Sequence, residues 1–204
     1  WRAQVNDYSL AGLQGRELRN LTVGILGTGK IGAAVIKNLS GFGCRILASD
    51  IRENPSLKGL CTYVDNETLY KACDIISLHM PLLDSTRHFV NAETIAKMKD
   101  GVTIINCARG ELMNIPDMIR GIETQKIGAL ALDVFDKEDG IYHENRRDDI
   151  ISNRDMAYLR QFPNVIMTQH MAFYTDAAVQ SMVFCGIEGL CDFAKTGHTA
   201  TELV

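Results

Sequence analysis

Short apolar runs rich in β-branched residues alternate with segments of helical periodicity along most of the chain. Several runs are apolar almost throughout, which is typical of strands covered on both faces of a parallel sheet. The predicted strands are Leu21–Leu26, Cys44–Ser49, Ile75–His79, Val102–Cys107, Ala129–Val134 and Val165–Thr168, with a weaker one at Cys61–Val64. The predicted helices are Ile31–Leu39, Asn66–Lys71, Ala92–Lys99, Ile115–Thr124, Asp155–Gln161 and Thr175 to about Lys195.

This alternation predicts an α/β fold, a doubly wound parallel sheet of the Rossmann type built from right-handed βαβ units. We expect residues 21–196 to form that domain. The charged run Lys137–Arg154 interrupts the alternation and is predicted to be a surface excursion near the carboxyl edge of the sheet. The first 20 residues read as the end of a preceding element, so we expect the chain to begin in the middle of a longer protein.

The composition is that of an ordinary soluble globular protein, with 204 residues, 46% hydrophobic and 23% charged. A formal net charge of -4 gives no reason to expect nucleic acid or an anionic membrane as a partner. We find no apolar stretch of the ~20 residues that span a bilayer. Trp1 to Leu10 has no apolar core, so no signal peptide is visible.

Cysteine usage favours an intracellular protein. No two cysteines form a CxxC pair, so no metal site is expected. Several lie in apolar, strand-like runs, which predicts buried free thiols in the reducing cytoplasm. The six cysteines are Cys44, Cys61, Cys73, Cys107, Cys185 and Cys191.

A G-x-G-x-x-G motif, Gly27–Gly32, follows the first predicted strand directly and opens the first predicted helix. Gly27 allows a tight turn, Gly29 lets the backbone approach a pyrophosphate, and Gly32 lets the helix pack closely on the strand. The free N–H groups of the helix N-terminus then face the phosphates. The sequence therefore predicts a dinucleotide site here.

Asp50 ends the second predicted strand, about 20 residues after the glycine motif, where such sites carry an acid. A carboxylate there accepts hydrogen bonds from the adenosine ribose and repels a 2′-phosphate, so NAD is favoured over NADP. Arg52 is near enough to weaken that preference.

Three polar residues follow the ends of later predicted strands, namely Arg109, Glu138 and His170. Parallel strands bring their carboxyl ends to one edge, where open α/β sheets bind ligands. An arginine can hold a substrate carboxylate, a histidine can donate a proton at neutral pH, and a glutamate beside it stabilises the imidazolium. Taken alone, each residue would more often have a structural or surface role, and Glu138 lies in a charged run.

The chain resembles the D-isomer-specific 2-hydroxyacid dehydrogenases over nearly its whole length. Five segments match in order: Gly27–Gly32 with Asp50, Ser77–Leu82 with Thr86 and His88, Ile105–Gly110, Leu132–Phe135 with Glu138, and Asn164–His170 followed by Ala172–Thr175. Two positions depart from the family pattern. Gln169 and Asp139 stand where the family often has proline, which leaves the stiffness of these loops open.

The resemblance implies roles for individual residues. Arg109 would bind the substrate carboxylate, His170 would be the general acid in reduction and the base in oxidation, and Glu138 would be its partner. The residues implied to bind NAD are Gly27, Gly29, Lys30, Ile31, Gly32, Asp50, Met80, Pro81, Thr86, Cys107, Ala108, Arg109 and Asp133. Among these, Lys30 and Ile31 would contact pyrophosphate through their backbone, and Cys107 and Asp133 would contact the nicotinamide end.

The insert Ile141–Arg160 and the Phe173–Thr175 ending resemble the D-lactate and D-2-hydroxyisocaproate dehydrogenases within the family. The resemblance thus implies reversible hydride transfer between NADH and a small 2-keto acid. A dehydrogenase for glycerate, phosphoglycerate or formate is an alternative, as is an NAD-sensing binding protein with this fold. A full acid–base set argues against the sensor.

Family members also have a substrate domain, built mostly from the N-terminal part of their chain, which is largely absent here. The segment 1–20 resembles the stretch that enters the cofactor domain, and 197–204 resembles the tail that returns to the missing one. We therefore expect the chain to bind NAD and turn over poorly. The resemblance also implies a homodimer.

Overall fold

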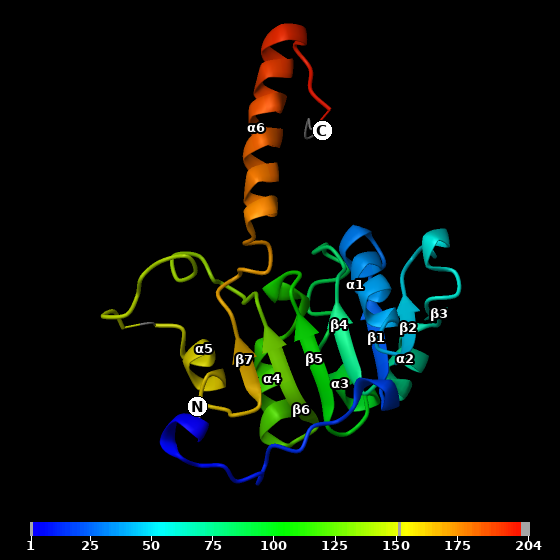
Figure 1. Cartoon of the computed structure of the whole chain (residues 1–204), viewed down its shortest axis with the longest axis vertical. Helices are drawn as coiled ribbons and strands as arrows, with labels where there is room; N and C mark the ends of the chain where they lie inside the picture. The colour runs from blue at the N-terminus through cyan, green and yellow to red at the C-terminus, as the bar shows by residue number, and fades with distance from the viewer. Residues whose placement is uncertain (1, 151, 201–204) are drawn as a thin grey trace.

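The chain folds around one parallel sheet with the strand order β3-β2-β1-β4-β5-β6-β7 (Figure 1). The computed structural model describes residues 2–150 and 152–200. The strands are β1 (Thr22–Leu26), β2 (Arg45–Ser49), β3 (Thr62–Tyr63), β4 (Ile75–Leu78), β5 (Val102–Asn106), β6 (Ile127–Leu132) and β7 (Val165–Met167). The strand order reverses between β1 and β4, which creates the topological switch point where such sheets bind ligands.

Helices lie on both faces of the sheet. They are α1 (Lys30–Ser40), α2 (Asn66–Ala72), α3 (Ala92–Lys97), α4 (Ile115–Glu123), α5 (Arg154–Leu159) and α6 (Asp176–Thr196). Short 3₁₀ turns lie at Arg2–Val5, Leu18–Asn20, Pro55–Leu57 and Gly110–Leu112. In the view of Figure 1, α1 lies in front of β1, whereas α3 and α4 lie behind the sheet. This doubly wound arrangement confirms the predicted fold class.

Alternate residues of the central strands serve two separate cores. Val23 and Ile25 of β1 pack with Ile36 of α1 on one face. On the other face, Leu26 and Ile76 belong to a larger core that extends to α4. Because both faces of β1 and β4 are covered, these strands read as nearly continuous apolar runs in the sequence.

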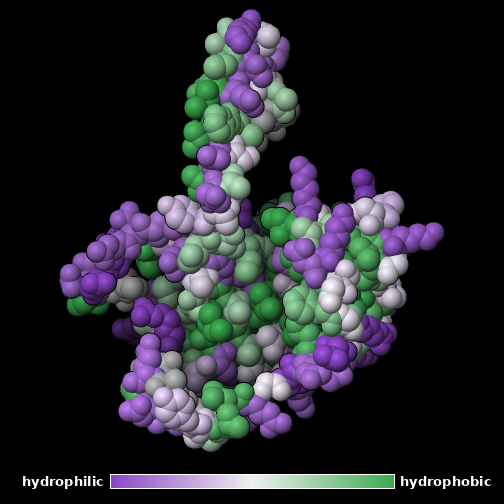
Figure 2. Space-filling view, viewed as in Figure 1, coloured by the Kyte–Doolittle hydropathy of each residue, from purple (hydrophilic) through white to green (hydrophobic). Residues whose placement is uncertain are grey.

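One face of β5, β6 and β7 is not covered by any helix among the residues described here (Figure 1). On β7, Ile166 is 65% exposed. Ile105, Ala129 and Ala131 are half-buried on the neighbouring strands. Figure 2 shows apolar side chains in this central area of the surface, to the side of α1. A sheet face of this kind is normally covered by a further layer.

Helix α6 stands away from the sheet and has no buried residue over its 21 residues (Figure 1). Its N-cap is Thr175, and it ends at Gly197 with a left-handed φ of 74°. By length and composition alone α6 could cross a membrane, contrary to the expectation that no stretch is long enough. That is weak evidence, because core helices of water-soluble proteins meet the same criteria.

The predicted elements are all present, with small differences at their ends. β6 begins at Ile127, two residues before the predicted start, because Ile127 pairs with Val102 before a bulge in the ladder. α3 ends at Lys97 because Met98 is extended. Trp1, Ile151 and the part of the predicted tail at 201–204 lie outside the described residues. The domain boundaries at 20 and 196 stay predictions.

The cysteines are free thiols, but the prediction that they are buried holds only for Cys73, since Cys44 and Cys61 are half-buried and the other three are exposed. Cys185 and Cys191 are exposed because they lie on α6, away from the core. Cys107 is exposed because it follows the end of β5 at the open edge of the sheet. Cys73 is buried, and burial raises the pKa of its thiol to about 12.

Candidate active site

The glycine motif forms the turn between β1 and α1, at the switch point of the sheet. Gly27 has a φ of 94°, a left-handed conformation that favours glycine. A Cβ on Gly32 would overlap the carbonyl oxygen of Gly27, so the helix approaches the turn too closely for a side chain. A Cβ on Gly29, by contrast, would meet no atom within 4 Å. The surface above Gly29 is therefore open to a ligand.

The N-terminus of α1 fits a pyrophosphate. The N-cap residue Gly29 has no side chain to bind the first N–H groups, whereas α2 to α6 all have a side-chain cap. The first N–H groups of an α-helix have no partner within the helix, and they attract anions. Lys30 and Ile31, which begin the helix, are exposed at this end.

Asp50 lies beside the phosphate loop, as the sequence predicts. Its Oδ2 accepts hydrogen bonds from the amide and the hydroxyl of Thr28, at 2.5 and 3.0 Å. Burial raises the pKa of Asp50, but these bonds and those from the amides of Arg52 and Ile51 together hold it below its ordinary value. The carboxylate therefore stays ionised and oriented, which suits an acceptor for ribose hydroxyls.

The next predicted cofactor residues follow β4, the neighbour of β1. Met80 and Pro81 lead into a turn in which the Thr86 hydroxyl donates to the Pro81 carbonyl at 2.7 Å. The same hydroxyl accepts the amide of Leu83 at 2.8 Å. Thr86 thus braces the turn, and its contact with NAD stays a prediction.

Cys107, Ala108 and Arg109 follow β5 on the same edge. Asn106, which ends β5 fully buried, accepts from the Ala108 amide and donates to the Arg109 carbonyl at 2.8 Å. Sequence reasoning missed Asn106, although a polar residue that ends an apolar strand is a usable signal. Its amide fixes the backbone that presents the arginine.

Arg109 is exposed, and its Nη1 donates to the neighbouring Ala108 carbonyl at 2.7 Å. The next residue, Gly110, packs so closely on the backbone of Phe135 and Asp136 that a Cβ would overlap them. This contact joins the segment that carries Arg109 to the segment that carries Glu138. The guanidinium retains donors for a carboxylate, which it can bind with two parallel hydrogen bonds.

Glu138 and His170 form a hydrogen-bonded pair, with Nδ1 and Oε1 2.5 Å apart. Both side chains are partly buried, at 24% and 29% exposed. The other oxygen of Glu138, Oε2, accepts the Phe135 amide at 2.9 Å, which fixes the carboxylate. His170 itself has a left-handed φ of 55°. The structure thus brings together two residues that the sequence only places on one edge.

Asp133 organises the turn that carries the histidine. It is only 4% exposed. Its Oδ1 accepts the Thr168 hydroxyl at 2.5 Å and the Met171 amide at 2.9 Å, and its Oδ2 accepts the Ala172 amide at 2.8 Å. Burial raises the pKa of Asp133, but these bonds and the nearby His170 ring together hold it below its ordinary value. Its predicted contact with the nicotinamide stays a prediction.

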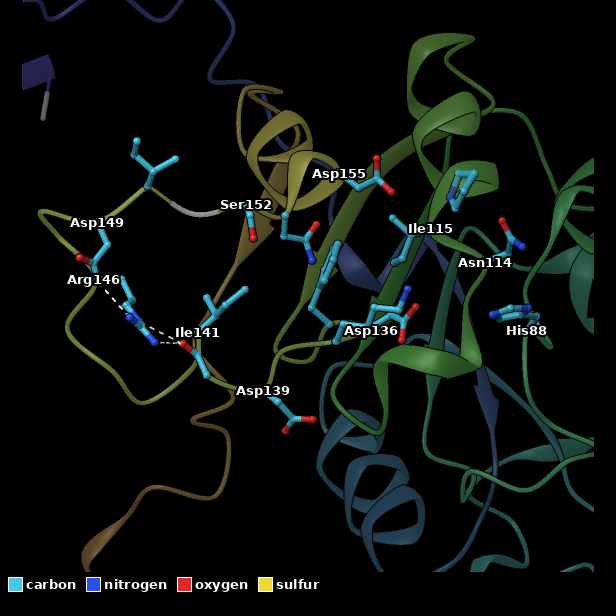
Figure 3. Close-up of a pocket in the computed structure, with 16 residues that line it drawn as sticks. His88, Asn114, Ile115, Asp136, Asp139, Ile141, Arg146, Asp149, Ser152 and Asp155 are labelled. Atoms are coloured by element: carbon cyan, nitrogen blue, oxygen red, sulfur yellow. Dashed lines mark hydrogen bonds and ion pairs between the residues drawn. The ribbon is translucent and has the colours of Figure 1, made fainter.

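A cavity of about 830 Å³ lies between the excursion after β6 and the start of α4 (Figure 3). Asn114 and Ile115 line one side, and Asp136, Asp139 and Arg146 line the other. No residue of the phosphate loop lines it, and neither Arg109 nor His170 does. The lining therefore includes the neighbours of Glu138 in the chain, Lys137 and Asp139, but none of the predicted cofactor and catalytic side chains.

Known proteins resemble this chain throughout. The family model of the D-isomer specific 2-hydroxyacid dehydrogenase NAD binding domain matches residues 2–172. An aromatic 2-oxoacid reductase of Clostridium sporogenes is 45% identical over 204 residues, which are 100% of this chain and 62% of the relative. A D-lactate dehydrogenase of Lactobacillus delbrueckii subsp. bulgaricus is 42% identical over 179 residues, 87% of this chain and 54% of the relative.

Solved structures agree with the fold. A D-lactate dehydrogenase from Sporolactobacillus superposes with a TM-score of 0.93 at 36% identity, covering 99% of this chain and 61% of the other. A D-lactate dehydrogenase from Aquifex aeolicus, solved with NAD and lactic acid, has a TM-score of 0.88 at 32% identity, with 100% and 64% covered. The chain spans about 62% of the length of the Clostridium relative. The chain belongs to the D-isomer-specific 2-hydroxyacid dehydrogenases, a family of NAD-dependent oxidoreductases, and carries their NAD-binding domain.

Proposed function

We propose that the protein is a D-2-hydroxyacid dehydrogenase of the D-lactate type, which interconverts a small 2-keto acid and its D-2-hydroxy acid with NADH and NAD. One observation carries the proposal. The Glu138–His170 pair lies at the same carboxyl edge of the sheet as Arg109 and the phosphate loop. A proton donor, a carboxylate-binding cation and a dinucleotide site are the parts that this reaction needs.

Bound NADH supplies the hydride, and the side chains supply the proton and the charge. With Nδ1 of His170 held by Glu138, the other ring nitrogen, Nε2, is the one that can face a substrate. In reduction it donates a proton to the ketone oxygen, and in oxidation it takes the proton back. Glu138 holds the ring that donates in one orientation. Arg109 binds the substrate carboxylate and polarises the ketone.

The substrate class is the finer part of the proposal. Relatives named D-lactate dehydrogenase support a small aliphatic 2-keto acid. A second candidate is an aromatic 2-oxo acid, because a relative named aromatic 2-oxoacid reductase is 45% identical over the full chain. A panel of pyruvate, branched 2-keto acids, phenylpyruvate, hydroxypyruvate and CO₂ tests the choice in the full-length protein. A preference for phenylpyruvate would replace the D-lactate assignment.

For the 204-residue chain itself, we expect NAD binding with little turnover. Support comes from the length of the relatives, since the chain spans 62% of one of them. Isothermal titration calorimetry with NAD tests the binding, and an NADH–pyruvate assay on the same sample tests the low turnover. Vigorous pyruvate reduction would contradict the low turnover. Normal NAD affinity without any 2-keto acid reduction in the full-length protein would favour an NAD sensor instead.

A homodimer and a cytoplasmic location are further proposals. The uncovered face of β5–β7 and the apolar side chains of α6 offer area for a subunit contact. Sedimentation of the full-length protein tests the oligomeric state, and a monomer at micromolar concentration would exclude the dimer. Cell fractionation tests the location that the free thiols favour.

A further inference from the structure

The catalytic histidine has a second histidine beside it, His143, from the excursion that follows β6. Nε2 of His143 lies 3.0 Å from the backbone carbonyl oxygen of His170. A carbonyl oxygen only accepts, so this nitrogen carries the hydrogen and donates it. The two imidazole rings have their centres 6.0 Å apart, and each also meets the ring of Phe173 edge-on. His143 thus touches both the backbone and the ring of the residue proposed to move the proton.

The backbone at His170 needs such support. Its φ of 55° is a conformation that non-glycine residues rarely adopt and that costs about 1 kcal/mol or more. Asp133 holds the flanks of the turn through the Thr168 hydroxyl and the amides of Met171 and Ala172. The carbonyl of His170 itself is bonded by His143 and not by Asp133.

Glu138 and His143 belong to one short, locally closed segment. The amides of Ile141 and Tyr142 both donate to the carbonyl of Glu138, at 3.0 and 3.1 Å, which makes a helical turn. This turn sets the spacing between the carboxylate and the second imidazole. One segment therefore holds His170 at two points, the ring through Glu138 and the backbone through His143.

The segment is anchored on both sides. Tyr142 is half-buried and packs against the larger core of the sheet. Further along, Arg146 donates to the carbonyl of Gly140 from Nε and Nη2, at 2.9 and 2.6 Å, and pairs with Asp149 at 3.0 Å (Figure 3). These bonds fold the excursion back on itself, so His143 is presented by a braced loop.

We propose that His143 is a positioning residue for the dehydrogenase reaction, which fixes the backbone of His170 while Glu138 fixes its ring. The proposal deepens the function proposed above and rests on it for its effect on turnover. The claim that His143 fixes the backbone of His170 can be measured without any catalysis. A residue that acts through His170 should change the order of the 168–172 turn and kcat, but not the affinity for NAD.

Two substitutions separate the hydrogen bond from the packing of the ring. His143→Phe keeps an aromatic ring against Phe173 and removes the donor, whereas His143→Gln keeps an N–H donor of similar reach. His198→Phe is the matched control, since it makes the same change beyond the far end of α6.

In the 204-residue chain, hydrogen exchange of the Met171 and Ala172 amides is measured by NMR. We expect about fivefold faster exchange in His143→Phe, the size of one ordinary hydrogen bond, and near-normal exchange in His143→Gln.

The full-length enzyme provides the second measurement. His143→Phe should lower kcat for 2-keto acid reduction about fivefold with an unchanged KM for NADH, and His143→Gln should restore most of it. Unchanged exchange and unchanged kcat in a folded His143→Phe protein would overturn the proposal, as would an equal effect of His198→Phe. If the unsubstituted enzyme reduces no 2-keto acid, the proposed function fails and the exchange measurement alone decides the role of His143.

Discussion

The Nδ1 atom of His170 lies 2.5 Å from Oε1 of Glu138, although 32 residues separate them in the chain. The other carboxylate oxygen, Oε2, accepts a hydrogen bond from the Phe135 amide, so the direction of the carboxylate does not depend on the histidine. A preset carboxylate holds the imidazole in one orientation and fixes which ring nitrogen it occupies. The pair is therefore built to deliver a proton from the opposite ring nitrogen.

Replacing Glu138 with Gln should lower kcat for 2-keto acid reduction about tenfold. The amide can still reach Nδ1 of His170, but a neutral hydrogen bond replaces a charge-assisted one and holds the imidazole less firmly. Steady-state rates of the full-length enzyme at pH 7 measure the change. Asp139→Asn, which alters the adjacent carboxylate, is the control and should leave kcat in place. A kcat of Glu138→Gln equal to the original would show that Glu138 does not act on the proton donor.

Replacing His170 with Ala should remove proton transfer and spare the dinucleotide site. We expect kcat to fall by about 10²–10⁴, the usual contribution of a general acid. NAD affinity, measured by calorimetry, should change by less than about twofold, since the phosphate loop lies at β1, several strands from β7. A large loss of NAD affinity together with turnover would mean that His170 chiefly supports the fold.

Alanine at two glycines of the phosphate loop should separate folding from binding. At Gly32 the new Cβ would overlap the Gly27 carbonyl, so we expect about 1–3 kcal/mol of destabilisation. At Gly29 it would meet no protein atom, so stability should stay within about 0.5 kcal/mol. NAD affinity of Gly29→Ala should still fall about tenfold, because the Cβ occupies the path of the pyrophosphate. Thermal melts and calorimetry test the contrast, and normal NAD affinity in Gly29→Ala would place the pyrophosphate elsewhere.

Asp74 should contribute stability that depends on pH. Burial raises its pKa, but the Thr22 amide, Lys99 and Arg16 together hold it below its ordinary value. A depressed folded-state pKa stabilises the protein above the unfolded value of about 3.9 and loses that effect as the pH falls through the folded value.

Asp74→Asn should therefore cost about 1–3 kcal/mol at pH 7, and the difference from the unsubstituted chain should shrink as the pH falls below about 4. Denaturant unfolding at several pH values measures it. Arg16→Ala removes only the exposed ion pair and should cost less than about 1 kcal/mol. If the difference in unfolding free energy between Asp74→Asn and the unsubstituted chain stayed constant down to pH 2, the titration of Asp74 would not contribute to stability.

The order of strands and helices was already determined by the sequence, because the elements depend on local pattern. The apolar runs of β1 and β4 and the glycine motif before α1 predict a Rossmann-type sheet with a dinucleotide site. Arg109, Glu138 and His170 could be placed on one edge, since each follows a strand. Their roles came from resemblance, and these role assignments stay predictions.

Only the tertiary structure decided which hydrogen bonds connect the residues at the carboxyl edge of the sheet. Asp133 accepts hydrogen bonds from the turn around His170, and His143 bonds the His170 carbonyl. Both contacts depend on loop conformations that bring together residues 27 to 39 positions apart in the chain. The sequence pattern also predicted α6 as one more helix of the domain, whereas none of its described residues is buried. Hydrophobic periodicity shows that a face must be covered, and it does not show which surface covers it.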